Sequence, residues 1–253
     1  MSEAQNKMRK AQARKQLPAI DLFPRVQYNG KTLDVALFGP NAYGPNREKM
    51  QERYFHSDAL SNITFRPLST TESLAVASHD FSNLAKPHIF NPRWLQAGYI
   101  LRTQEGVWVN PVEDAEGKIL MDAKELEKRL DKKVNGIYLL EGDTSFVPYD
   151  SFERGVQEHE TFLEGGLARG LMHTTDKKAT ILAPIANNTE YPRKVDVWGF
   201  DSVKEPALRV VSLDSGSLGG RLYVGGDGWY DFNDGFAFGG LVSASGEASA
   251  RKI

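Results

Sequence analysis

The densest group of residues that can do chemistry is a stretch of 14 residues that begins at Gly225. It joins aromatic rings to carboxylates and glycines, and the residues of interest are Asp227, Trp229, Tyr230, Asp231 and Asp234. The carboxylates could supply oxygen ligands to calcium, although the alternate spacing and late glutamate of a calcium loop are missing. A ring that stacks on a sugar beside hydrogen-bonding groups is a second interpretation, and a tight turn with aromatics in the core is a third. We take these five as candidate binding residues for a ligand or partner, without assigning a metal.

The rest of the sequence contains no pattern that indicates a metal or cofactor site. There is no cysteine, which excludes disulfides, cysteine-ligated zinc, iron–sulfur clusters and thiol nucleophiles. The five histidines form no pair at the spacing of metal ligands. His159 with Glu160 and Glu164 resembles part of a metal-binding helix, but on a helix the glutamates fall on another face than His159. We predict that His159 packs in the core with one nitrogen satisfied, and we expect no metal and no cofactor.

Short catalytic motifs are absent from the sequence. The segment nearest to a nucleophile elbow, Ser215-Gly216-Ser217, has no predicted helix after it, and no phosphate-binding loop occurs. Catalytic residues are therefore left unassigned. A pair of catalytic carboxylates has no short signature, so an enzyme in which the fold brings two carboxylates together remains open.

Charge divides the chain into a basic arm and an acidic body. The chain of 253 residues has a net charge of −2, but residues 1–16 carry five cations against Glu3 and have a net charge of +4. The five cations are Lys7, Arg9, Lys10, Arg14 and Lys15. The remaining 237 residues carry −6, which argues against a broad nucleic-acid-binding face. Because large apolar groups are almost missing from the arm, we expect it to be disordered alone or ordered by a partner.

Turn and capping signals predict the first elements of the body. Asn29-Gly30 predicts a hairpin over 25–38, and a Gly-containing turn at 104–106 predicts a second one. Ser69 with Glu72 has capping-box spacing before a helix to about Leu84. Further predicted elements are a strand at 63–67, a helix after Asp122, a strand at 134–140 that is interrupted early by Gly136, and a helix that starts at Asp150 with a break at Gly165-Gly166.

Everything after Thr174 is expected to be strand. The predicted runs are 180–185, 195–200, 208–213, 221–224 and 236–242, separated by proline, asparagine, aspartate or glycine clusters. We infer an α+β fold in which an antiparallel sheet dominates the C-terminal half and a few helices are interspersed. Residues 1–17 form the basic arm, and residues 18–253 form one domain with a weak possible subdivision near residue 149.

Two functions from different classes follow. The first is a non-enzymatic assembly or interaction protein whose basic arm docks on the acidic body of a neighbouring copy or on another protein. The alternative is a hydrolase or carbohydrate-handling enzyme with carboxylates brought together by the fold, in a cleft near Trp229 or Trp198. Nucleic acid is a partner only through the arm. No apolar run approaches the ~18–20 residues of a membrane span and no secretory signal is visible, so we expect a soluble cytoplasmic protein without a membrane partner.

Overall fold

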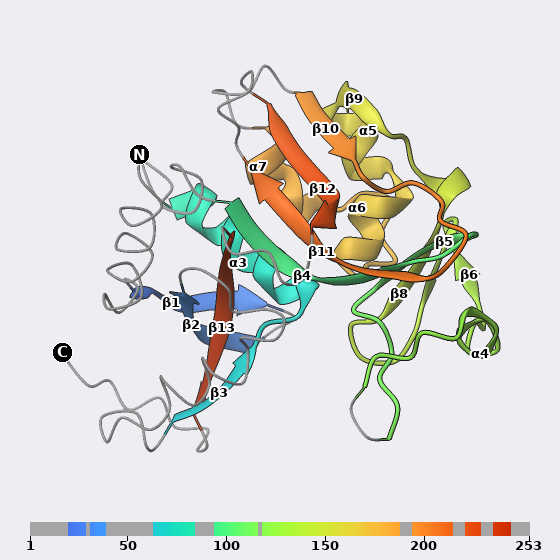
Figure 1. Ribbon diagram of the computed structural model, residues 1–253. Coiled ribbons are helices and arrows are strands. Elements are labelled where there is room, and N and C mark those ends of the chain that lie inside the picture. Colours follow the sequence, from blue (N-terminus) through green and yellow to red (C-terminus); the bar gives the residue numbers. More distant parts are fainter. Residues whose placement is uncertain are drawn as a thin grey trace, which may run out of the picture.

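Thirteen strands pair into one mixed sheet in the computed structural model of the chain. The structure describes residues 20–28, 31–38, 63–83, 94–115, 118–187, 194–214, 221–228 and 235–243. Nine strands follow one another in the order β6-β7-β8-β5-β4-β11-β12-β10-β9 (Figure 1). Their bounds are β4 (Trp94–Arg102), β5 (Gly106–Val109), β6 (Lys133–Val134), β7 (Ile137–Leu139), β8 (Ser145–Pro148), β9 (Gly155–Glu158), β10 (Lys194–Trp198), β11 (Ala207–Asp214) and β12 (Leu222–Gly228).

The four remaining strands join this sheet through β4. They are β1 (Ile20–Tyr28), β2 (Lys31–Phe38), β3 (Ile63–Pro67) and β13 (Gly235–Ser243). β13 pairs antiparallel with β2 and β3 and runs parallel to the start of β4. The register of the β1–β2 hairpin pairs Tyr28 with Lys31, which leaves the predicted two-residue connection at 29–30. The strand predicted at 63–67 is also present.

The expected α+β class is confirmed, but the C-terminal strands are not all antiparallel. β12 pairs antiparallel with β11 and parallel with β10. In the sequence β12 follows β10 and β11, but in the sheet it lies between these two strands. Hydrophobic alternation identifies strands but not the order in which they pair, and the sequence therefore missed the parallel contact.

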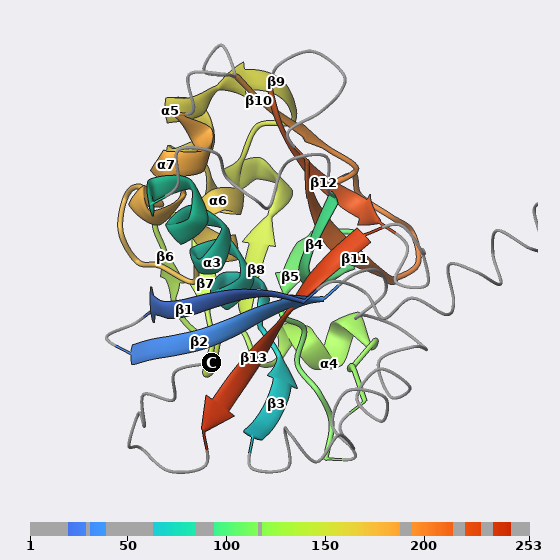
Figure 2. The ribbon, with the colours of Figure 1, turned by 90° about the vertical axis from the view of Figure 1, so that its left-hand side faces the viewer.

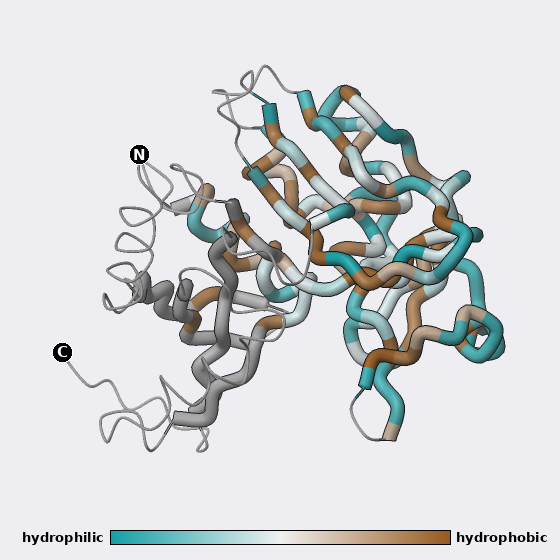
Figure 3. The backbone as a smooth tube through the Cα atoms, in the orientation of Figure 1, coloured by the Kyte–Doolittle hydropathy of each residue, from teal (hydrophilic) through white to brown (hydrophobic). Residues whose placement is uncertain are grey.

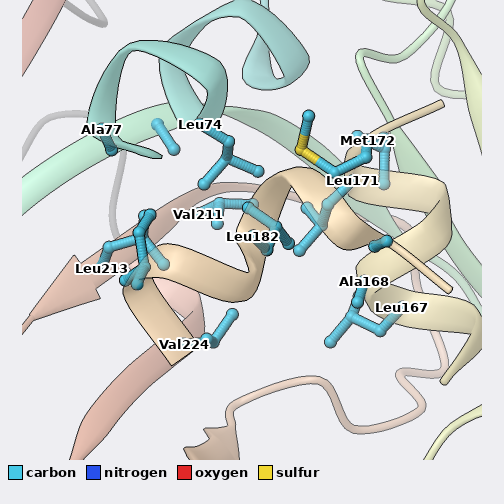
Figure 4. Packing of buried hydrophobic residues seen from close by; sticks show 14 of the residues in the cluster. Leu74, Ala77, Leu167, Ala168, Leu171, Met172, Leu182, Val211, Leu213 and Val224 are labelled. Carbon is cyan, nitrogen blue, oxygen red and sulfur yellow. The ribbon is translucent and has the colours of Figure 1, made fainter. Parts of the chain in front are cut away.

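Helices cover one face of the sheet, as the two perpendicular views show (Figures 1 and 2). These helices are α3 (Thr70–Asn83), α5 (His159–Glu164), α6 (Gly166–Leu171) and α7 (Ala183–Ala186). Leucine side chains of α3 and α6 meet valines and leucines of β11 and β12 in the main core (Figure 4). A smaller core on the opposite face holds Leu101, Trp108, Leu126 and Phe146 under α4 (Ala123–Glu127). Where Figure 3 is coloured, hydrophobic and hydrophilic segments alternate along the strands, whereas the region of α4 is mostly hydrophilic.

Both predicted capping signals are found at helix starts. The backbone N–H of Ser69 donates to the Glu72 carboxylate at 3.0 Å, and the N–H of Glu72 donates to the Ser69 hydroxyl at 3.2 Å. Asp122 caps α4 by accepting from the N–H groups of Lys124 and Glu125. These contacts satisfy backbone donors that a helix start leaves without an intrahelical partner.

Three predicted elements are wrong, one of them only in part. The helix expected from Asp150 begins only at His159, after a 3-10 turn over Tyr149–Ser151 and the strand β9. Gly155 has a φ of 81°, which a helix does not allow, while the predicted break at Gly165 is present. The strand expected at 180–185 is instead a 3-10 turn over Thr180–Leu182 followed by α7, whose first turn contains Pro184.

The third of these elements, the strand expected at 134–140 with an early interruption at Gly136, is wrong only in part, because the chain reverses at the interruption. It is a hairpin of β6 and β7 because Asn135 and Gly136 both have positive φ and form a tight two-residue turn.

No helix among the described residues is long and apolar enough to cross a membrane. The basic arm lies outside the described residues, and the assignment of residues 18–253 to one domain stays a prediction.

Removal of a buried leucine at the helix–sheet contact tests this core. Leu163 on α5 has no exposed surface, so Leu163→Ala should lower the free energy of unfolding by about 2–5 kcal/mol. Ile181→Ala is the matched control, since Ile181 is 45% exposed, and it should change stability by less than about 1 kcal/mol. Urea denaturation midpoints measure both; equal midpoints for the two variants would contradict the described packing.

Candidate functional site

The structure describes Asp227 among the candidate binding residues predicted from the sequence. Trp229, Tyr230, Asp231 and Asp234 lie outside the described residues. The arm residues lie outside them too, namely Lys7, Arg9, Lys10, Arg14 and Lys15. Asp227 is near the end of β12, so the site is built outward from it.

Asp227 belongs to the open face, which we define as the outer surface of β9, β10, β12 and β11. The buried Val195, Val197, Leu222 and Val224 point from these strands into the helix-covered core. Residues between them along the strands must then point outward, because side chains alternate across a sheet. No described helix lies over this face; α5, α6 and α7 are all on its other side (Figures 1 and 2).

Trp198 is the most prominent side chain of the open face. It ends β10, is 46% exposed and pairs with Gly225 of the parallel strand β12. A Cβ placed on Gly225 would lie 3.2 Å from the Trp198 Nε1 and 2.5 Å from the Ser212 Oγ. The missing side chain at Gly225 therefore leaves the space that the indole and the Ser212 hydroxyl occupy.

The loop 199–206 follows Trp198 and is held by a hydrogen-bonded contact with β4. Arg102, at the end of β4, donates from Nε and Nη2 to the Asp201 carbonyl oxygen at 3.0 and 2.8 Å. The Tyr149 hydroxyl lies 3.0 Å from the same oxygen and 3.1 Å from the Thr103 carbonyl oxygen. Arg154 donates to the Asp201 carboxylate at 3.1 Å. The segment after Trp198 is thus fixed by donors from three separate elements.

Asp227 lies directly beside this fixed loop. A Cβ placed on Gly199, whose φ is 74°, would come within 2.9 Å of both Cβ and Cγ of Asp227. Only a residue without a side chain lets the loop backbone approach the carboxylate this closely. Gly225 and Asp227 are two residues apart on one strand, about 7 Å between Cα atoms, so the indole and the carboxylate are neighbours on the open face.

Partial burial raises the pKa of Asp227 above its ordinary value of 3.8. The nearby charges of Arg102 and Arg209 lower this pKa, and Asp201 raises it, but desolvation is the largest effect. Within the described part of the chain, the carboxylate is bonded only to its own backbone N–H. Asp227 is therefore a partly desolvated carboxylate that forms no ion pair with a cation in the described ranges.

A second feature lies at the edge strand β9 and extends to α5 on the helix-covered side of the sheet. The segment 141–164 contains seven carboxylates and Arg154 as its single lysine or arginine, so it carries the entire net charge of −6 of the body. Six of these carboxylates are exposed, and we name five of them the acidic surface: Asp150, Glu153, Glu158, Glu160 and Glu164, with Glu141 as the sixth.

Only part of the acidic surface is neutralised by neighbouring cations. Glu158 pairs with Lys194, and Glu160 pairs with Lys178. The hydrogen bond from Lys178 lowers the pKa of Glu160. Asp150, Glu153 and Glu164 form no ion pair with another residue that the structure describes. The acidic surface therefore keeps negative charge available to a cationic partner.

His159 lies at the start of α5 between these features. Its side chain is 12% exposed, and Nε2 lies 3.1 Å from the Glu160 carboxylate. Nδ1 is buried without a hydrogen-bond partner, so one nitrogen is satisfied, as predicted. No group of three His, Asp or Glu side chains that suits a metal ion occurs among the described residues.

Arg102 and Tyr149 were not among the candidate residues from the sequence, and Trp198 entered only as a possible neighbour of the cleft of the alternative enzyme. Trp198 carried a usable signal, because alternation with Val195 and Val197 places it on the outer face of a strand. Arg102 and Tyr149 carried none, since both act on the carbonyl of Asp201, which is far away in the sequence. No family model, curated protein or solved structure matches the chain.

The raised pKa of Asp227 predicts a pH-dependent effect of Asp227→Asn. A carboxyl group whose pKa is raised by folding binds its proton more tightly in the folded state, so ionisation costs stability above that pKa. Asp227→Asn should therefore raise the free energy of unfolding at pH 7, and this gain should vanish below about pH 4, where both states are protonated. Urea midpoints at pH 7 and pH 3 measure it, with the exposed Asp131→Asn as control. A gain of equal size at both pH values would contradict the explanation by desolvation.

Proposed function

We propose that this chain is a non-enzymatic assembly protein whose basic arm docks on the acidic body of a neighbouring copy. The observation that carries the proposal is the distribution of charge. The arm holds +4, and the whole net charge of −6 of the body falls within residues 141–164. Opposite charges concentrated on two separate parts of one chain favour contact between copies, because they attract over distances set by the ionic strength.

The acidic surface supports this proposal through its unpaired carboxylates. Asp150, Glu153 and Glu164 are exposed and pair with no cation among the described residues, so an incoming lysine or arginine does not have to displace one of those cations. Exposed single ion pairs contribute only about 0–1 kcal/mol each. Several contacts together with an apolar anchor are therefore needed for a stable assembly.

The alternative, a hydrolase or carbohydrate-handling enzyme, has a weaker basis. Such an enzyme needs two available carboxylates, and Asp227 beside Trp198 supplies one of them. The second nearby carboxylate, Asp201, is bound by Arg154. A cytoplasmic location remains part of the proposal and follows from the sequence alone.

Removing the charge of the basic arm or of the acidic surface should dissociate the assembly. We expect the full chain to form oligomers at low salt, measured by size-exclusion chromatography with light scattering. Replacing the five arm cations by glutamine should give monomers, as should the triple variant Asp150→Asn, Glu153→Gln, Glu164→Gln. High salt should act in the same direction, since the screening length falls from about 8 Å at physiological ionic strength to about 3 Å at 1 M.

The matched control removes three exposed carboxylates outside the acidic surface, Glu105→Gln, Glu127→Gln and Asp131→Asn. It changes the net charge of the body by the same amount and should leave the oligomers intact. A full chain that is monomeric at low salt and micromolar concentration would refute self-assembly. Equal dissociation by both triple variants would show that total charge matters and the acidic surface does not.

A further inference from the structure

The open face presents an apolar anchor, and its edge strand β9 also carries Glu158 of the acidic surface. Four large hydrophobic side chains in the described part of the chain are at least 40% exposed, and two of them, Val156 and Trp198, lie on the neighbouring strands β9 and β10. Exposed tryptophan at the centre of a charged rim is typical of residues that dominate binding energy at protein interfaces. The anchor and its rim therefore mark a docking surface, and the chemistry around Trp198 decides what docks there.

Asp227 restricts the occupant to one that donates hydrogen bonds. An apolar partner that covered Trp198 would also cover this carboxylate without a bonding partner, which costs free energy. The Asp227 carboxylate would repel an anionic group brought into direct contact with it. A cationic group satisfies the carboxylate and is attracted to the indole face.

The other charged groups near Asp227 are already engaged. Arg102 is bound to the Asp201 carbonyl, and Arg154 to the Asp201 carboxylate. Arg209 donates to the Leu208 carbonyl at 2.7 Å. The carboxylate of Asp196, also on the open face, lies 3.6 Å from Arg221. None of these four cations forms an ion pair with Asp227, so its carboxylate stays available to an incoming one.

We propose that an arginine of the basic arm of a neighbouring copy, Arg9 or Arg14, lays its guanidinium on the Trp198 indole and donates to the Asp227 carboxylate. The inference rests on the proposed function and names the contact that gives it specificity. Arginine suits the site better than lysine because its planar guanidinium stacks on an aromatic ring while its edge donates to a carboxylate. The lysines of the arm then contact the acidic surface, which requires charge but no fixed geometry.

The length of the arm allows this contact. Arg9 lies 11 residues before Ile20, the first residue that the structure describes. A chain of that length spans up to about 36–40 Å when extended. An arm with this reach can extend beyond its own body and meet the open face of a second copy.

The test changes the shape of the cationic groups of the arm without changing the charge of the arm. The double variant Arg9→Lys, Arg14→Lys keeps the arm at +4, and we expect its self-association constant, measured by sedimentation equilibrium at low salt, to fall about tenfold. Lys7→Gln is the matched control, which removes one charge but keeps both arginines and should weaken association only about two- to threefold. On the body, Trp198→Ala and Asp227→Asn should each weaken association about tenfold, whereas the exposed Ile181→Ala should have no effect.

The outcomes separate this inference from the proposed function. If the arginine-to-lysine, Trp198→Ala and Asp227→Asn variants associate like the unmodified chain while the five-glutamine arm variant does not, the arm docks elsewhere on the body and only this inference is overturned. If the five-glutamine variant also associates normally, the proposed function itself fails. Asp227→Asn keeps the test valid should Trp198→Ala fail to fold, because that variant is predicted to gain stability at pH 7.

Discussion

The carbonyl oxygen of Asp201 is the point on which the arrangement of the open face depends. It accepts two hydrogen bonds from the buried Arg102 and lies within hydrogen-bonding distance of Tyr149. Hydrogen bonds from a charged donor contribute about 1.5–3 kcal/mol each, more than neutral ones. This contact fixes the loop 199–206 across the end of β4. Gly199, which begins that loop, and Trp198, which precedes it at the end of β10, are held against β12 as a result.

The close approach of this loop explains the properties of Asp227. Gly199 lies against the Asp227 side chain and shields it from water, which raises its pKa although Arg102 and Arg209 are near. Both arginines are held on backbone carbonyls and do not pair with it. A carboxylate that is partly desolvated and unpaired beside an exposed indole is unfavourable in an isolated chain. It becomes favourable when a cation docks, and this is the physical reason to connect Asp227 with the basic arm.

Local signals made part of the fold predictable from the sequence. The Ser69–Glu72 capping box and the hairpin around positions 29–30 depend on residues within four positions of each other, and both are present. The spacing of Phe152, Val156 and His159 imitated a helix because three- and four-residue intervals also occur by chance in a short strand followed by a helix. Val156 is exposed on β9 and Phe152 packs on the core, so one face of one helix never contained both.

Of the candidate site, the sequence predicted the distribution of charge but not the arrangement of the side chains. The composition separates a basic arm from an acidic body, and Asp227 stood out by its neighbours in the sequence. The position of Trp198 beside Asp227 depends on the parallel pairing of β10 with β12, a contact between segments joined through β11. Pairing across such a distance depends on the whole sheet, and no short pattern encodes it.

Complementation between two variants whose association is weakened tests most directly whether the arm of one copy docks on the open face of another. The five-glutamine arm variant keeps the open face, and Trp198→Ala keeps the arm, so each supplies the half that the other lacks. When equal amounts are mixed at low salt, at a concentration at which neither variant associates alone, light scattering should detect a 1:1 complex. A mixture that stays monomeric, under conditions in which the unmodified chain assembles, would contradict the account.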